Sequence, residues 1–229
     1  MILAIFISDI HSNLEALEAF SQDAPKAPIY CLGDIVGYGA DPNETISWVK
    51  KKTAGCILGN HDYAVTTSDS SWFNHLAANA INWTRRIISS ENLSFLTSLR
   101  KKMYFYVDSN NIMITHGSPR NPLYEYIYQD TEESTFKNFL KTEKTQIIGL
   151  GHTHKPFLWR TLDGLIFNPG SIGQPRSGVP EASYAILKKE SGKLEIEHRR
   201  IKYDVKKAAQ KIISSGLPTF FAERLFKGV

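Results

Sequence analysis

The chain has 229 residues, of which 42% are hydrophobic, and a net charge of +4 at pH 7. A chain of this size and composition can bury a sizeable core, and we expect a single domain over residues 1–229. No apolar run is long enough to span a membrane, and the apolar Met1–Ile7 lacks the basic region and cleavage site of a signal peptide. We therefore expect a soluble, cytoplasmic protein.

Cysteines and basic residues are not arranged as binding sites. Cys31 and Cys56 fall inside apolar runs, so we expect small core residues rather than thiolate ligands or a disulfide. The basic residues between 188 and 211 are typical of a solvated face, so nucleic-acid binding is the less favoured interpretation. A homo-oligomer remains open.

In the first half of the chain, expected strands alternate with helices. The strands are the Ile-rich or apolar runs Ile2–Ile7, Ile29–Leu32 and Cys56–Leu58, which are bounded by Gly, Asp and Asn. Apolar residues at helical spacing predict a helix over Asn13–Phe20. The pattern of Asp41-Pro-Asn-Glu44, an N-cap followed by Pro and Glu, predicts a helix to about residue 51.

The second half is expected to be richer in strands. Two helices come first, over about Ser71–Ile88 and Glu91–Leu99. Three strand pairs that flank turns follow: Lys102–Val107 with Ile112–Thr115, Leu158–Leu162 with Leu165–Phe167, and Ser183–Leu187 with Leu194–Ile201. A last helix follows Asp204. This α/β pattern predicts a four-layer αββα sandwich, in which two mixed sheets pack face to face between helices.

Five apolar runs each end in residues that bind metals. These residues are Asp9 and His11, Asp34, Asn60 with His61, His116 after Ile112–Ile114, and His152 and His154 after Ile147–Leu150. In α/β sheets, ligands bind outside the carboxyl ends of the strands, so we expect one site there. Without His61, two carboxylates, four imidazoles and one amide oxygen make seven donors. That number suits two ions with a bridging carboxylate. A nitrogen and oxygen set without thiolate favours Mn, Fe, Zn, Co or Ni over Mg or Ca, with Mn preferred.

The same residues form motifs that resemble a known family. Asp-Ile-His at 9–11, Gly-Asp-Ile-Val at 33–36, Gly-Asn-His-Asp at 59–62, Thr-His-Gly at 115–117 and Gly-His-Thr-His at 151–154 are similar, in order, to the five blocks of the calcineurin-like metallophosphoesterase superfamily. The segment Asn168–Arg176 resembles the one that follows in its small, single-domain prokaryotic branch of phosphodiesterase-like proteins. The superfamily also has the αββα fold.

The resemblance implies a role for each residue of these motifs. One ion would be held by Asp9, His11, Asp34 and His154. The other would be held by Asp34, Asn60, His116 and His152. His61 is implied as the general acid and Asp62 as its orienting partner. The protein phosphatases of the superfamily carry an Arg soon after the bridging Asp. The segment Gly33–Gly39 has none, which argues against a phosphoprotein phosphatase.

The donor set indicates hydrolysis of phosphate esters. Two divalent ions carry four positive charges, and the carboxylates of Asp9 and Asp34 cancel two of them. Metal binding lowers the pKa of water from 15.7 to about 7, so a hydroxide that bridges the ions is available as the nucleophile. The leaving oxygen then needs a proton, and His61 is placed to supply it because it follows the ligand Asn60. We expect a hydrolase of phosphodiester, phosphomonoester or anhydride bonds.

Candidate substrate contacts come from aromatic and basic residues near the motifs. Tyr124 and Tyr126 follow His116 and favour stacking on a nucleobase, although half-buried packing is the commoner role of such residues. Tyr38 and Arg176 are further candidates, and Arg176 has the alternative role of tying down its loop. A small nucleotide-like phosphate ester is the expected substrate.

Two alternatives stay open. A nuclease on DNA or RNA would need a basic groove beside the metals, and the basic stretch lies far along the chain. A catalytically silent scaffold of the same fold would lack ligands or the catalytic His, all of which are present here. His75 and His198 belong to no motif, and we expect both at the surface.

Overall fold

The computed structural model describes residues 1–229 as two five-stranded sheets and eight helices. The first sheet has the order β10-β9-β1-β2-β3 and the second has the order β4-β5-β6-β8-β7. The strands of the first sheet are β1 (Ile2–Ile7), β2 (Ile29–Cys31), β3 (Gly55–Cys56), β9 (Ala182–Glu190) and β10 (Lys193–Ile201). Those of the second are β4 (Lys102–Val107), β5 (Asn110–Thr115), β6 (Ile147–Gly149), β7 (Phe157–Arg160) and β8 (Leu165–Asn168).

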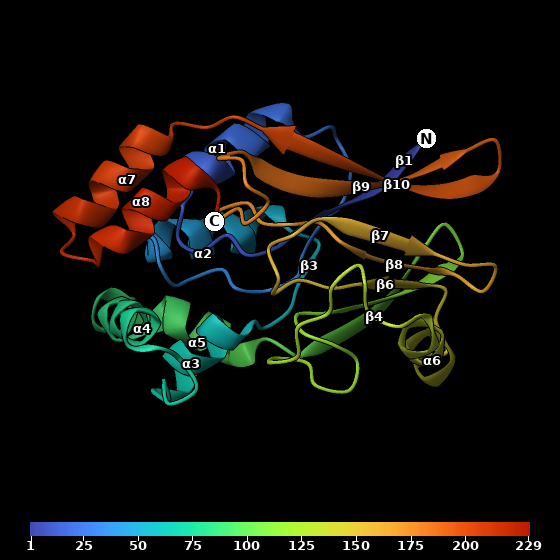
Figure 1. Ribbon diagram of the computed structural model, residues 1–229, viewed down its shortest axis with the longest axis horizontal. Coiled ribbons are helices and arrows are strands. Elements are labelled where there is room, and N and C mark those ends of the chain that lie inside the picture. The colour runs from blue at the N-terminus through green and yellow to red at the C-terminus, as the bar shows by residue number, and fades with distance from the viewer.

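The helices cover the outer faces of both sheets. They are α1 (Leu14–Asp23), α2 (Pro42–Lys52), α3 (Asn60–Thr67), α4 (His75–Ile87), α5 (Ser90–Ser98), α6 (Glu133–Glu143), α7 (Val205–Ser214) and α8 (Thr219–Lys227). Figure 1 shows α6 against the second sheet, whereas the other helices gather at the opposite end of the molecule. No helix is both long and apolar enough to cross a bilayer.

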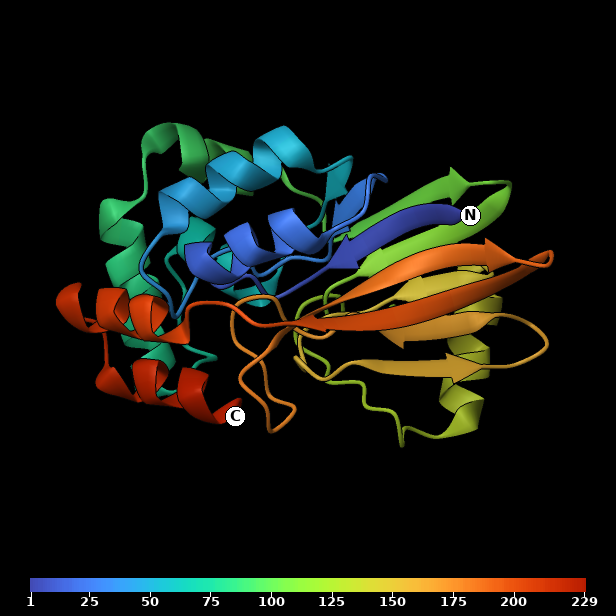
Figure 2. The ribbon, with the colours of Figure 1, turned by 90° about the horizontal axis from the view of Figure 1, so that it is seen from above.

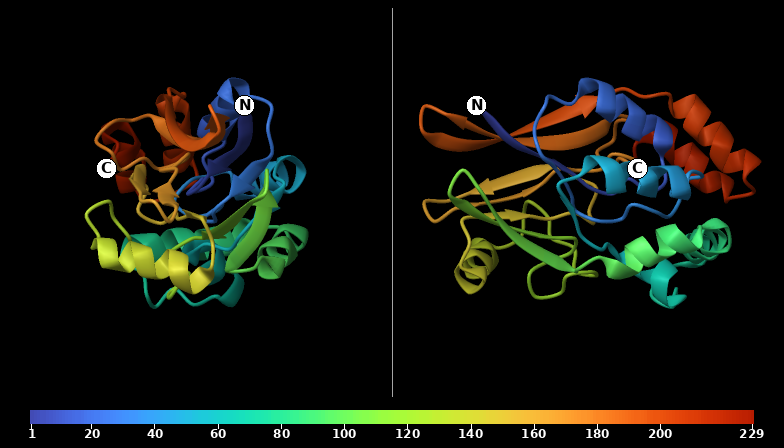
Figure 3. Two further views of the ribbon diagram at one scale, coloured as in Figure 1. Left: turned by 90° about the vertical axis from the view of Figure 1, so that its right-hand side faces the viewer. Right: turned by 180° about the vertical axis from the view of Figure 1, so that it is seen from behind.

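Three hydrophobic cores separate the four layers. Phe6, Leu32, Ile114 and Phe167 belong to the core between the two sheets. On the outer face of the first sheet, residues such as Ile5 pack with α1, α2, α3 and α5. On the outer face of the second sheet, Met113 and its neighbours pack with α6. The views in Figures 2 and 3 show the two sheets lying face to face. The predicted αββα sandwich with two mixed sheets is confirmed.

Parallel pairing brings the predicted strand ends to a common edge. β1 pairs in parallel with β2, and β2 with β3. In the second sheet β5 pairs in parallel with β6. Parallel strands end on the same side of a sheet, so the segments after these five strands meet where the sheets adjoin the helical end of the molecule.

Several predicted boundaries differ from the structure. Helices α3, α6 and α8 were not predicted, and the helix expected from Ser71 begins only at His75. The strand expected over Leu158–Leu162 ends at Arg160, and Leu162 is fully exposed at the hairpin turn. Asp41 stands at the N-cap position of α2, but its side chain makes no capping bond. It accepts hydrogen bonds from Lys211 Nζ instead.

The two histidines outside the motifs have different surroundings. His75 is exposed, as predicted. His198 is half-buried and its Nε2 lies 2.8 Å from the carbonyl oxygen of Asn168. The predicted surface position of His198 is therefore wrong. The His198 ring on β10 contacts the last residue of β8. The alternating polar pattern of β10 does not reveal this contact.

Candidate metal centre

The seven predicted metal ligands converge in one buried cluster. None of their residues is more than 4% exposed. They follow five different strands, as their order in the chain predicts: Asp9 and His11 after β1, Asp34 after β2, Asn60 after β3, His116 after β5, and His152 and His154 after β6. Buried carboxylates and imidazoles at this density are unusual unless they bind one another or a metal ion.

Backbone carbonyl groups fix the orientation of three imidazoles. The Nδ1 atoms of His11, His116 and His154 lie 3.0, 2.8 and 2.5 Å from the carbonyl oxygens of Val36, Leu32 and Gln174. A carbonyl only accepts, so each Nδ1 carries the proton and donates it. In a neutral ring, Nε2 then presents its lone pair to the centre of the cluster, which is the geometry of metal-binding histidines.

The atoms at the centre would repel one another without a cation. His154 Nε2 lies 3.3 Å from Asp9 Oδ1 and 3.2 Å from His11 Nε2. Asp9 Oδ1 and His152 Nε2 are buried and have no hydrogen-bond partner. Lone pairs that face each other at such distances need positive charge between them. The residues therefore fit a site for metal ions.

The donors divide into two groups that share Asp34. Donor atoms of Asp9, His11 and His154 lie within 4.8 Å of one another, as do those of Asp34, His116 and His152. A ring nitrogen of His61 lies within the same distance of His11 and Asp34. Asp34 Oδ2 lies 3.7 Å from His11 Nε2 and 3.3 Å from His116 Nε2, so it faces both groups. Asn60 Oδ1 lies 3.0 Å from His116 Nε2 and joins the second group. This division agrees with two ions bridged by Asp34.

Protonation of the cluster reflects the crowding of charge. Burial lowers the pKa of His11 and of His154. Burial also acts to lower the pKa of His116, but Asp34 and Asp9 raise it to about 10. In the protein without metal, the proton on His116 supplies positive charge beside the carboxylates of Asp9 and Asp34. A metal ion can supply that charge instead. Metal ions and protons should compete for this site.

The ligands occupy strained backbone conformations. Five of the seven have positive φ between 47° and 67°, namely Asp9, His11, Asp34, His152 and His154. Such conformations cost about 1–3 kcal/mol per residue and are concentrated at functional sites. Close packing adds a further constraint, because a Cβ atom on Gly59 would lie 2.1 Å from Asp34 Oδ1. Backbone conformations of this cost are typical of binding sites.

Comparison with known proteins assigns the family. The calcineurin-like phosphoesterase superfamily domain matches residues 1–192. The chain belongs to this superfamily. It is 39% identical over 242 residues to an uncharacterized protein of Methanocaldococcus jannaschii, with 97% of this chain and 96% of that protein covered.

Solved structures agree with this assignment of a calcineurin-like phosphoesterase. A metallophosphoesterase from Sphaerobacter thermophilus is 33% identical, with a TM-score of 0.86 and coverage of 100% of this chain and 99% of that one. A hypothetical protein from Pyrococcus horikoshii gives a TM-score of 0.88 with 22% identity over 100% and 99% of the chains, which shows the fold. The superfamily implies divalent metal ions, and the geometry above provides donors for them.

His61 lies beside the donors, on the wall of a cavity of about 180 Å³. Its ring packs against Tyr38 and Phe73, with centroids 4.4 and 4.7 Å away. Its Nδ1 is buried without a hydrogen-bond partner. Burial lowers the pKa of His61 to about 4, so the free protein holds a neutral imidazole at pH 7. A bound phosphate anion would favour the protonated form.

Asp62 makes hydrogen bonds other than the one that we predicted. Its Oδ1 accepts hydrogen bonds from the N–H groups of Ile35 and Val36, at 2.9 and 3.1 Å. Its Oδ2 accepts one from the N–H of Gly59 at 3.0 Å. No hydrogen bond joins Asp62 to the His61 ring, so the expected orienting contact is absent. Asp62 instead fixes the two loops that carry Asp34 and Asn60.

Three of the four predicted substrate contacts line the cavity, namely Tyr38, Tyr126 and Arg176. Tyr124 does not, because its ring packs against Trp72 with centroids 4.7 Å apart. Trp72 itself lines the cavity and is 47% exposed, although the sequence did not single it out. The aromatic pair Trp72-Phe73 within an otherwise polar stretch was the available signal.

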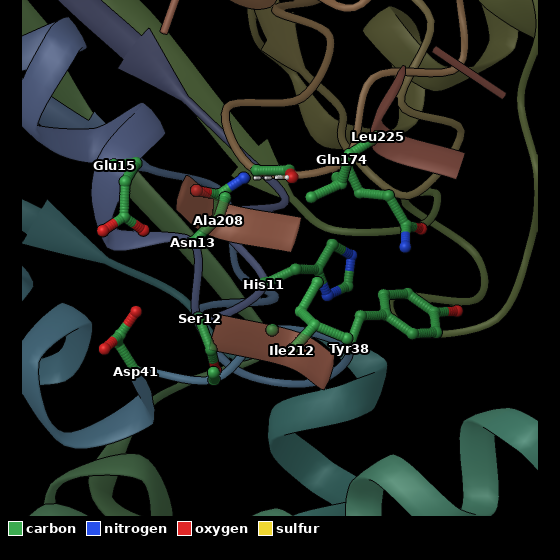
Figure 4. A pocket seen from close by; sticks show the side chains of 13 residues that line it. His11, Ser12, Asn13, Glu15, Tyr38, Asp41, Gln174, Ala208, Ile212 and Leu225 are labelled. Carbon is green, nitrogen blue, oxygen red and sulfur yellow. Dashed lines mark hydrogen bonds between the residues drawn. The ribbon is translucent and has the colours of Figure 1, made fainter. Parts of the chain in front are cut away.

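The C-terminal helices close the back of the site. α7 and α8 lie beyond the matched region, and Phe221 of α8 packs on Tyr38 with centroids 4.8 Å apart. Lys211 of α7 pairs with Glu15 at 2.7 Å. Between these helices and His11 lies a space of about 10 Å³, enough for about one water molecule (Figure 4). The larger cavity is lined by Trp72 and Tyr126 instead.

Proposed function

We propose that the chain hydrolyses a phosphodiester or phosphoanhydride bond in a small nucleotide-like substrate, with two divalent metal ions. The supporting observation is the buried cluster of seven donors, in which the carboxylate of Asp34 faces two groups of ligands. Asp9, His11, Asp34 and His154 would hold one ion, and Asp34, Asn60, His116 and His152 the other. When bound, such ions act as Lewis acids and make water a nucleophile near neutral pH.

His61 is the proposed general acid. His61 lines the cavity. It directly follows the proposed ligand Asn60, so it lies close to any phosphate bound at the metal donors. Its Nδ1 is fully buried and faces Gly37, so Nε2 is the atom available to carry a proton to the leaving oxygen. Burial lowers the pKa of His61, so its protonation depends on the negative charge of the substrate. Asp62 acts as a positioning residue through the backbone of the Asp34 loop.

The walls of the cavity favour a substrate with an aromatic base. Trp72 and Tyr126 expose about half of their surface, and their ring planes are only 22° apart. Both flank the donors, so a base attached to the reacting phosphate would meet a π-surface there. Arg176 supplies a guanidinium to the same cavity. The segment after Asp34 offers none, which disfavours a phosphoprotein phosphatase.

Turnover of a substrate panel tests this proposal. The purified protein would be freed of metal with a chelator, reloaded with Mn, Fe, Zn, Co or Ni, and assayed on cyclic nucleotides, nucleoside polyphosphates, mononucleotides and phosphopeptides. We expect metal-dependent hydrolysis with nucleotides preferred. Absence of turnover with every metal would contradict the enzyme assignment and favour a scaffold. A preference for phosphopeptides would contradict the substrate class.

A further inference from the structure

A second, larger depression adjoins the metal cavity. It has a volume of about 840 Å³ and is lined by residues that include Tyr128, Lys155, Arg176, Gly178 and Arg200. Arg176 lines both this groove and the metal cavity. Lys155 directly follows the metal ligand His154. The groove therefore begins where the metal cavity ends.

The groove gathers cations that have no anionic partner in the protein. None of the ion pairs in the structure includes Lys155, Arg176 or Arg200. No carboxylate therefore lies within 4.0 Å of their charged groups. Arg176 Nη2 donates to Gln174 Oε1 at 3.1 Å, but its Nε is buried and has no partner. The Arg176 guanidinium lines both depressions without a carboxylate partner, so an anion bound there can accept hydrogen bonds from its accessible N–H groups.

Arg200 belongs to the basic stretch that we expected to be a solvated face. Much of that stretch behaves as expected, because Lys188 and Arg199 pair with Glu197, and Lys211 pairs with Glu15. Arg200 differs, since β10 brings it to the groove beside Lys155. Arg200 is therefore solvent-exposed, as predicted, on a face that borders the groove.

Volume separates the roles of the two depressions. Sites for small ligands measure about 300–1,000 Å³, so the metal cavity of about 180 Å³ is too small to enclose a whole nucleotide with several phosphates. The groove has the size of a ligand site. Two parallel tyrosines join the depressions: Tyr126 lines the cavity, Tyr128 lines the groove, and their centroids are 6.2 Å apart. A substrate can extend from one into the other along these rings.

We propose that the groove binds a second phosphate group of the substrate, through Lys155, Arg176 and Arg200. This inference rests on the proposed function and narrows its substrate class to compounds with more than one phosphate, such as nucleoside polyphosphates. A nucleic-acid strand also carries neighbouring phosphates, but it would need a basic track longer than three cations in one groove. The size of the groove and the presence of Asp130 on its wall favour the small molecule.

The test compares substrates that differ in phosphate number. Arg200→Gln removes a cation from the groove, and Arg160→Gln is a matched control, because Arg160 is also an exposed strand arginine but lines a different depression. The readout is the ratio of kcat/KM for a nucleoside triphosphate to that for bis(p-nitrophenyl) phosphate, which has one phosphate. We expect Arg200→Gln to lower this ratio by about tenfold, as for one charge-assisted contact, and Arg160→Gln to leave it unchanged.

Equilibrium binding gives a second readout that does not depend on turnover. Calorimetry on the metal-loaded protein would compare a nucleoside methylene-triphosphate with inorganic phosphate. Arg200→Gln and Lys155→Gln should each weaken binding of the triphosphate analogue by about tenfold more than they weaken binding of inorganic phosphate. An unchanged ratio in both assays would overturn the groove proposal while leaving the phosphoesterase proposal intact. Tight, strongly salt-dependent binding of an oligonucleotide that is lost in Arg200→Gln would overturn it in favour of a nuclease.

Discussion

Asp34 is joined to the backbone of His61 by a hydrogen bond of 2.8 Å from the His61 N–H to Oδ1. This bond occupies one carboxylate oxygen and turns the other, Oδ2, toward the imidazoles of His11 and His116. The same contact fixes the start of α3, and with it the proposed general acid His61, relative to the proposed bridging ligand. A change at Asp34 should therefore affect both metal groups together.

Asp34→Asn should release both ions. The amide keeps the size of the side chain but removes the negative charge that both groups share, so both sites lose affinity. We expect an activity loss of at least about 100-fold. Mutation of a residue that only hydrogen-bonds to a metal ligand already lowers metal affinity or activity by about 10–100-fold. Metal content per chain, measured by elemental analysis after dialysis, is the readout. Two ions retained with near-normal turnover would refute the bridging assignment.

His61→Ala should separate chemistry from metal binding. His61 is outside the proposed ligand set, so both ions should remain, while kcat falls by about 10²–10⁴ for a poor leaving group. The deficit should shrink with nitrophenolate, which needs little protonation. Rates on a series of aryl and alkyl diesters would measure this. Equal losses across the series would indicate a role in substrate binding instead.

Asp62→Asn discriminates between the predicted and the observed role of this residue. Asp62 accepts hydrogen bonds from three backbone N–H groups. The side-chain amide of Asn would place its own N–H groups against at least one of these donors. Each buried group left without a partner lowers the free energy of unfolding by about 1–3 kcal/mol. We expect weaker metal binding, by about 10–100-fold, as for partners that orient ligands. The dependence of rate on leaving group should match that of the wild type. A dependence as steep as in His61→Ala would restore Asp62 as the orienting partner of His61.

Trp72→Leu should weaken binding of the base without disturbing the metals. Stacking contributes about 1–3 kcal/mol per base, so KM for nucleotides should rise by about 5–150-fold. KM for the matching ribose phosphate ester without a base should stay nearly constant. Tyr124→Leu is the matched control, because Tyr124 contacts Trp72 but does not line the cavity. Tyr126 is a poorer test, because its ring stacks on His152 with centroids 3.9 Å apart.

The convergence of the donor residues was predictable from the sequence because it depends on where strands end. The contacts of Asp62 were not, because they depend on the direction of its side chain. Apolar runs that stop at Asp, Asn or His predicted that the seven donor residues converge, since parallel pairing brings strand ends together. Adjacency to His61 suggested a contact with Asp62, but successive residues of a helix point in different directions, and α3 turns Asp62 toward the Asp34 loop. Helix α3 itself escaped prediction because its first residues form the ligand motif.

Contacts between distant segments left no local signal. Trp72 meets Tyr126 only because the loop before α4 folds over the segment after β5. Arg200 lies in an alternating, charged strand that is typical of a solvated face, and only the pairing of β10 with β9 brings it to the groove. The αββα architecture was predictable from periodicity and turns. The walls of the site required the tertiary structure.

The pH dependence of stability should reveal the half-buried His198. Burial lowers the pKa of His198 in the folded protein, although the carbonyl oxygen of Asn168 acts in the opposite direction. Above the unfolded pKa of about 6.5 both states are neutral, so His198 contributes no pH dependence there. As the pH falls below that value, the unfolded chain binds a proton more readily than the folded one, and stability is lost until the folded pKa is reached.

His198→Gln should remove this part of the acid sensitivity. Glutamine does not titrate, and its amide can still donate to the Asn168 carbonyl oxygen. We expect the free energy of unfolding to fall less between pH 7 and pH 5 in the variant than in the wild type. Urea unfolding at each pH, with a chelator present so that metal loss affects neither protein, provides the comparison. His75→Gln is the control, because it makes the same substitution at an exposed position on another element. A variant slope as steep as that of the wild type would mean that His198 titrates alike in both states.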